Sequence, residues 1–141
     1  MSHRGLDVLS EAESTELLRT HTFGRVVAKV GSDIAAFPVY YAYLDGAIVY
    51  RTDPGTKLAA AVLRTYVSFE IDDEKDGWSV MAFGPCEELR SPRAIEEAHE
   101  VLGSTWPDAE RQRVVRIRPE RITGRRLQNR RTGVNFTPSR G

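Results

Sequence analysis

The chain has 141 residues, a length that suits one domain with a hydrophobic core of its own. Its 40% hydrophobic and 28% charged residues are typical of a soluble globular protein, and no apolar run approaches the roughly 18 residues that a membrane span needs. The net charge is zero, but residues 111–141 hold ten arginines and one acid, so the C-terminal segment is strongly basic.

The cysteine, the histidines and the N-terminal residues narrow the classes of protein further. Cys86 is the only cysteine, which excludes an intrachain disulfide and any site built from several thiolates, and its expected role is that of a small buried apolar residue. His3, His21 and His99 lack a metal-binding spacing, so we expect no metal. The first residues lack the apolar stretch of a secretory signal, which favours the cytoplasm.

The first part of the chain predicts a helix followed by an antiparallel meander. Ser10 and Glu13 have the spacing of a capping box, which predicts a helix from there to about Thr20. Three segments rich in β-branched and aromatic residues then predict strands, because turns containing Gly and Asp separate them. These segments are residues 23–30, 34–43 and 47–52.

The middle and last parts of the chain mix helices and strands. Two more helices are predicted, over residues 56–64 and from Pro92 to about Gly103. Strand patterns cover residues 66–72, residues 78–84 continuing toward Leu89, and residues 113–118.

Five or six short antiparallel strands with a few short helices indicate a mainly β (α+β) fold. We expect an antiparallel split β-barrel rather than a doubly wound sheet. One domain should cover residues 1–141, with a flexible tail at residues 133–141. Pro38 has no N–H, so it must lie at an edge or bulge of its strand, where neighbouring backbone groups are left for a ligand.

The most suggestive segment for chemistry is residues 50–57. It places Arg51 at a strand end, then a glycine turn, then Thr56 and Lys57 at the start of a helix. The N–H groups of a helix start and the two cations favour a bound phosphate. On spacing alone, an exposed strand end with a solvated lysine is the competing interpretation, and the like charge of Asp53 favours it.

Other templates do not fit the chain. It has neither the glycine fingerprint of dinucleotide-binding folds nor a Walker-type phosphate loop. Nothing marks a Ser or Cys nucleophile beside a base, so covalent hydrolase chemistry is disfavoured and no catalytic residue is assigned.

The order of these features resembles the pyridoxamine phosphate oxidase-like FMN-binding split-barrel superfamily, over about Leu17 to Leu127. The resemblance is greatest to its short, mainly actinobacterial branch. Five motifs carry it: Phe23-Gly24-Arg25-Val26, Pro38-Val39, Arg51-Thr52 with Gly55-Thr56-Lys57, Phe69-Glu70-Ile71-Asp72, and Gly77-Trp78-Ser79-Val80. Each motif alone is unspecific, and the specificity comes from their order and spacing.

The resemblance implies a homodimer that holds FMN between its subunits. It places ten residues at the cofactor: Phe37, Pro38, Val39, Tyr40, Arg51, Thr52, Thr56, Lys57, Trp78 and Ser79. The strand from Phe37 to Tyr40 would edge the isoalloxazine ring, and the cations would hold the phosphate. Trp78 and Ser79 would reach the cofactor from the second subunit, whereas an ordinary barrel would use Trp78 as a core residue.

The chain departs from the family at the substrate signature. True pyridoxamine phosphate oxidases carry Arg-Leu-His-Asp-Arg near the C-terminus, and this chain has Arg126-Leu127-Gln128-Asn129-Arg130. Without the imidazole and carboxylate, synthesis of pyridoxal phosphate is not expected. Arg125 and Arg126 remain candidates to line the flavin phosphate or a substrate anion.

We therefore expect an FMN-dependent oxidoreductase acting on a small molecule, and three alternatives stay open. The first is a reductase that uses the deazaflavin F420, whose acidic tail would need the basic segment from Arg111 onward. The second is a flavin-storage or sensing protein without turnover. The third, docking of the arginine-rich segment on nucleic acid, is disfavoured because Phe136 is the only aromatic residue after Trp106.

Overall fold

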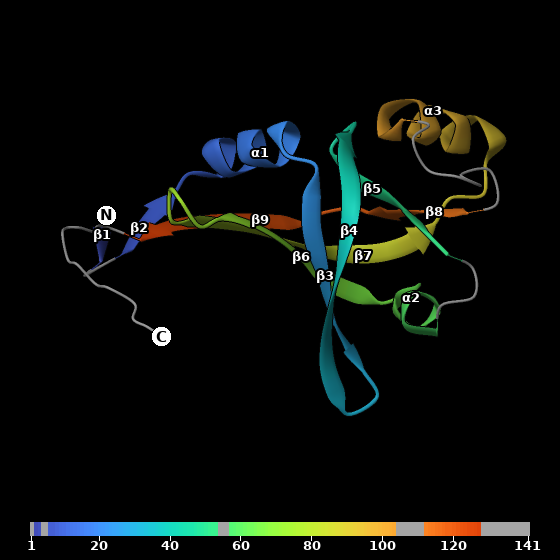
Figure 1. The fold of residues 1–141 in the computed structure, drawn as a ribbon, viewed down its shortest axis with the longest axis horizontal. Coiled ribbons are helices and arrows are strands. Elements are labelled where there is room, and N and C mark those ends of the chain that lie inside the picture. Colours follow the sequence, from blue (N-terminus) through green and yellow to red (C-terminus); the bar gives the residue numbers. More distant parts are fainter. Residues whose placement is uncertain (1, 4–5, 54–56, 104–111, 128–141) are drawn as a thin grey trace, which may run out of the picture.

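The computed structural model describes residues 2–3, 6–53, 57–103 and 112–127, which form three helices and nine strands (Figure 1). The helices are α1 (Glu11–Thr20), α2 (Lys57–Val62) and α3 (Pro92–Leu102). The strands are β1 (Ser2–His3), β2 (Leu6–Leu9), β3 (Phe23–Val30), β4 (Asp33–Leu44), β5 (Ala47–Thr52), β6 (Tyr66–Asp73), β7 (Trp78–Glu88), β8 (Arg113–Ile117) and β9 (Arg121–Leu127). None of the helices in these ranges has the length and apolar character needed to cross a membrane. The tail predicted at residues 133–141 lies outside the described residues.

Six of the strands close into an antiparallel barrel in the order β3, β4, β5, β8, β7, β6, with β6 pairing back to β3. β7 belongs to two sheets, because residues 78–83 pair with β9 and residues 86–88 pair with β8. Closure of the barrel removes most free strand edges. Because β7 pairs with β9 instead of β8 over residues 78–83, a side sheet of β9, β2 and β1 extends from the barrel. The predicted fold class is confirmed.

The sequence predicts where α1 begins and where α2 ends, and the structure confirms only the first of these predictions. At α1 the predicted capping box is confirmed: the Glu13 N–H donates to Ser10 Oγ at 3.0 Å, and the Ser10 N–H donates to Glu13 Oε1 at 2.8 Å. The helix predicted over residues 56–64 is shorter, because α2 ends at Val62. Arg64 has a φ of 67°, a left-handed conformation that cannot continue a helix.

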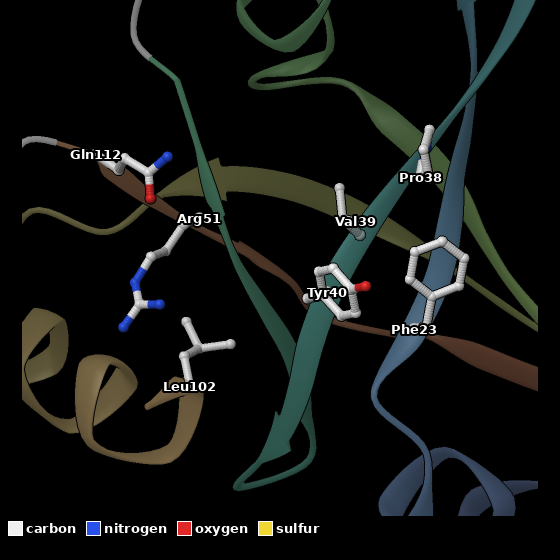
Figure 2. A pocket seen from close by; sticks show the side chains of 7 residues that line it. All are labelled: Phe23, Pro38, Val39, Tyr40, Arg51, Leu102 and Gln112. Atoms are coloured by element: carbon white, nitrogen blue, oxygen red, sulfur yellow. The ribbon is translucent and has the colours of Figure 1, made fainter. Parts of the chain in front are cut away.

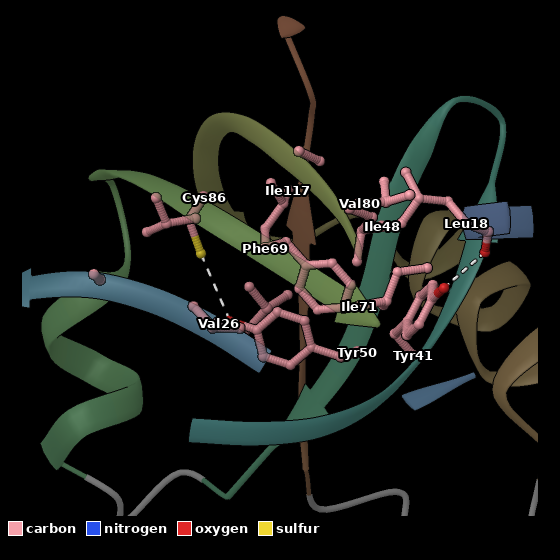
Figure 3. Close-up of a cluster of buried hydrophobic side chains, with 14 of the residues drawn as sticks. Leu18, Val26, Tyr41, Ile48, Tyr50, Phe69, Ile71, Val80, Cys86 and Ile117 are labelled. Atoms are coloured by element: carbon pink, nitrogen blue, oxygen red, sulfur yellow. Dashed lines mark hydrogen bonds between the residues drawn. The ribbon is translucent and has the colours of Figure 1, made fainter. Parts of the chain in front are cut away.

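The barrel interior holds the hydrophobic core (Figure 3). Buried and less buried side chains alternate along strands such as β6 and β7. Phe69 is fully buried in this core and contacts the Tyr41 ring edge-to-face, with the two ring centroids 4.8 Å apart. The Tyr41 hydroxyl donates to the Leu18 carbonyl at 2.7 Å, which ties the end of α1 to the barrel. Cys86 is buried beside Tyr50, as its sequence role predicts.

One edge of β4 is left open, and it positions the candidate site. β4 pairs with β3 along residues 33–40, whereas its register with β5 begins only at Tyr41. The β3–β4 hairpin therefore projects from the barrel (Figure 1). Pro38 lies opposite Arg25 in this projecting part, which confirms that it occupies a strand edge.

Candidate functional site

A pocket of about 280 Å³ lies between the open edge of β4 and the end of β5. Its lining comes from four elements and one residue just before β8: Phe23, Pro38, Val39, Tyr40, Arg51, Leu102 and Gln112. Arg51 and Gln112 stand on one side, and Phe23, Pro38 and Tyr40 on the other (Figure 2). The pocket thus has a polar wall on one side and an apolar, aromatic wall on the other.

The β4 wall offers backbone groups as well as rings. The Tyr41 N–H donates to the Thr22 carbonyl at 2.8 Å, and bonded and non-bonded pairs alternate along an antiparallel ladder. Pro38, which cannot donate, therefore takes a non-bonded position, and its carbonyl points to the open edge. Next to it the Phe23 and Tyr40 rings meet edge-to-face with centroids 5.1 Å apart, and their side chains are exposed.

Arg51 forms the polar wall and is already bonded to α3. Its Nε donates to His99 Nδ1 at 3.1 Å, and its Nη2 donates to the carbonyls of His99 and Gly103. These carbonyls belong to the last turn of α3, where a cation is favourable. Burial lowers the pKa of Arg51 from its ordinary value, yet guanidinium groups in proteins stay charged at neutral pH. Nη1 takes part in none of these three bonds.

Gln112 completes the polar wall. Its Oε1 is buried, and among the described residues it has no hydrogen-bond partner. A buried amide oxygen without a donor costs free energy, so native structures rarely keep one unless a ligand, ion or water satisfies it.

The structure brings four of the ten predicted site residues together in this pocket: Pro38, Val39, Tyr40 and Arg51. Phe37 instead packs against the barrel core. Thr52 is half-buried at the end of β5, opposite Arg113, and Lys57 is exposed as the first residue of α2. Thr56 lies outside the described residues.

Trp78 and Ser79 lie at a second pocket of about 500 Å³, which Arg125 and Leu127 also line. Trp78 is only 4% exposed and packs in the core, with the His21 ring edge-to-face at 5.0 Å. Ser79 is half-buried and lies opposite Arg125 of β9. Arg126 lines a different groove, beside α1.

Sequence reasoning missed three residues of the first pocket. Phe23 was within reach, because an aligned β3–β4 hairpin places it directly opposite Tyr40. Leu102 and Gln112 carry no local signal, since they reach the pocket only through the packing of α3 and the start of β8.

A closed six-stranded antiparallel barrel extended by a side sheet defines the class of split β-barrel proteins. The sequence model of one family in this class, pyridoxamine 5'-phosphate oxidase, matches residues 10–126, so the chain belongs to that family.

The chain is also similar to individual proteins. A structure of the FAD binding protein from Mycobacterium smegmatis is 32% identical, with a TM-score of 0.75 over 87% of this chain and 100% of that chain. A Corynebacterium glutamicum structure, described as a candidate pyridoxamine 5'-phosphate oxidase, is 35% identical, with a TM-score of 0.75 over 88% of this chain and 99% of that one. The uncharacterized Mycobacterium tuberculosis protein Rv0080 is 30% identical over 135 residues, covering 89% of this chain and 88% of its own length.

Proposed function

We propose that the protein binds a flavin in the pocket at the open edge of β4, with FMN as the cofactor, and acts as a flavin-dependent oxidoreductase. The proposal rests on one observation: the β4 edge and the aromatic rings beside it lie opposite Arg51 in a single pocket (Figure 2). A flavin needs these two environments together, because its ring system is flat and apolar with a polar rim while its tail ends in an anion. The FAD-binding relative supports a flavin as the class of ligand.

The protein's own groups would bind and orient the cofactor. The Pro38 carbonyl and its neighbours along the β4 edge would hydrogen-bond the polar rim of the ring. Arg51 would hold the phosphate through Nη1 while its other nitrogens keep α3 in place, with Thr52, Thr56 and Lys57 as further phosphate contacts. The bound flavin would supply hydride transfer, and the pocket walls would exclude water from its ring.

A second copy of the chain would complete the site, and the exposed apolar side chains support this. Of the seven large apolar side chains that are exposed in the described part of the chain, six lie on one face. They are Val8, Phe23, Ile34, Tyr40, Tyr66 and Leu127, all on the outward side of the sheet that runs from β2 to β4. Exposed large apolar side chains that share one side of a sheet are typical of an interaction surface, so we assign this face to a homodimer. Ser79 and Arg125 lie on the same face and would be carried to the partner's cofactor, with Trp78 behind them.

The basic segment gives less support to F420. In the described residues Arg116 donates to Glu87 at 2.7 Å, Arg118 lies 3.4 Å from the same carboxylate, and Arg113 lies 3.7 Å from Glu88. These three cations already lie beside carboxylates of the chain, with Arg116 and Arg118 sharing Glu87, so they are less available to an acidic cofactor tail.

The test is the absorption spectrum of the purified protein, followed by titration with FMN, FAD and F420. We expect a yellow protein that carries close to one FMN per subunit and binds F420 more weakly. A colourless protein that takes up none of the added flavins would contradict the proposal, and preference for F420 would replace FMN as the cofactor.

A further inference from the structure

The polar wall of the pocket contains a hydrogen-bond acceptor that is unsatisfied within the described residues. Gln112 Oε1 is buried and has no hydrogen-bond partner within the described residues. Arg51 is the cation in the pocket lining and stands on the same wall (Figure 2), but its hydrogen bonds described above run to His99 and Gly103 and not to Gln112. The cost of this unmatched oxygen is present in the free protein and is removed when a donor arrives.

Gln112 is able to meet such a donor from the pocket. Its residue is only half-buried and lines the cavity, so part of the side chain already faces the empty volume (Figure 2). The last torsion of a glutamine side chain is broad, so the amide turns its oxygen toward a ligand at little cost. An amide oxygen accepts from O–H or N–H groups and does not bind phosphate oxygens.

We propose that Gln112 is a specificity-determining residue that accepts a hydrogen bond from a ligand hydroxyl next to the anionic group held by Arg51. The two side chains on one wall then recognise a polyol phosphate: the guanidinium takes the phosphate, and the amide takes the adjacent hydroxyl (Figure 2). This inference rests on the proposed flavin function, in which the polyol is the ribityl chain.

The substitution Gln112→Met tests the contact, because methionine has a similar length and no amide. Affinities for FMN, riboflavin and lumiflavin would be measured by quenching of flavin fluorescence, together with the thermal midpoint of the ligand-free protein. Riboflavin keeps the ribityl hydroxyls without the phosphate, and lumiflavin has neither. We expect Gln112→Met to weaken FMN and riboflavin about equally, by roughly 3- to 10-fold, the size of one neutral hydrogen bond. Lumiflavin affinity should not change.

The thermal midpoint separates a binding role from a structural one. Because the substitution removes an unsatisfied buried oxygen, the ligand-free variant should be at least as stable as the original protein. Val101→Met, an apolar exchange at an exposed position of α3 outside the pocket lining, is the matched control and should leave all three affinities within about 2-fold.

Three results would overturn the inference. Unchanged affinity of Gln112→Met for FMN and riboflavin would show that the amide makes no contact. An equal loss for lumiflavin would place the contact on the ring, and a lowered midpoint with loss of all three ligands would make Gln112 structural. If the original protein bound none of the three flavins, the proposed function would fail first and this inference with it.

Discussion

Arg51 has two partners to satisfy, the carbonyls at the end of α3 and the proposed phosphate. Arg51→Lys keeps the charge but loses the planar fork, so one ammonium must replace contacts in two directions. We expect FMN affinity to fall about 10-fold or more, riboflavin affinity to fall less, and the free energy of unfolding to drop by about 1 kcal/mol as the end of α3 loses hydrogen bonds from the guanidinium. Fluorescence titration and thermal unfolding measure these effects.

Lys57→Ala is the companion to this experiment. It lies at the exposed start of α2, away from α3, so only the phosphate contact should be affected. Equal losses of FMN and riboflavin in both variants would mean that neither cation binds the phosphate.

Glu70 introduces a pH dependence on the outward face of the barrel. Burial raises its pKa from the ordinary 4.5 to about 7, Asp72 adds to the shift, and Arg25 at 3.2 Å opposes it. An acid whose pKa is higher in the folded state holds its proton when the unfolded chain has lost it, so stability falls as pH rises between about 4.5 and 7. We expect the thermal midpoint to decline across this window and Glu70→Gln to flatten the decline. Parallel profiles for the two proteins would rule out this assignment.

Most of the candidate site could be predicted from the sequence. Pro38 and Arg51 stand out locally, one as a proline inside a strand and the other as a cation at a strand end. That they face one another follows from the β4–β5 turn, which is also a local signal. Gln112 is about sixty residues from Arg51 in sequence, and the fold alone makes them neighbours.

The contact between α1 and β9 depends on a position that has no room for a side chain. A Cβ at Gly124 would collide with Ser14 Oγ and would lie 3.1 Å from Leu9 Cδ1. We expect Gly124→Ala to destabilise the protein by about 1–3 kcal/mol, the usual cost of overpacking. Adding Ser14→Ala should recover part of that loss, which a double-mutant cycle of chemical unfolding would measure. Strict additivity of the two changes would show that they do not meet.

The strands around this contact are those that the sequence did not predict. β9 contains three arginines, alternates weakly and is exposed over its last three residues, so it lacks the apolar period of a strand. It is a strand because β7 and β2 bind it on both sides. The barrel strands, by contrast, have one buried face, so apolar residues recur at every second position along them and predict a strand. β6 and β7 are examples.

If two copies build the cofactor site, flavin affinity should depend on protein concentration. Ile34 is 81% exposed on the proposed dimer face, so Ile34→Asp should weaken dimerisation and flavin binding together. Arg93→Glu, on the exposed side of α3, is the control and should alter neither. Sedimentation velocity combined with flavin titration over a range of protein concentrations makes the comparison. A monomeric protein that binds flavin at full affinity would contradict the shared site.

Because Cys86 is buried, the folded barrel should not react with thiol reagents. Its side chain is 1% exposed, and burial raises the pKa of its thiol to about 11, so at neutral pH the folded protein presents almost no reactive thiolate. Since the chain has no second cysteine, any labelling by a thiol reagent must follow an opening of the barrel. The rate of labelling therefore measures how often the barrel opens. If a ligand binds and stabilises the closed barrel, the labelling rate should fall, which detects binding without any dye or mutation.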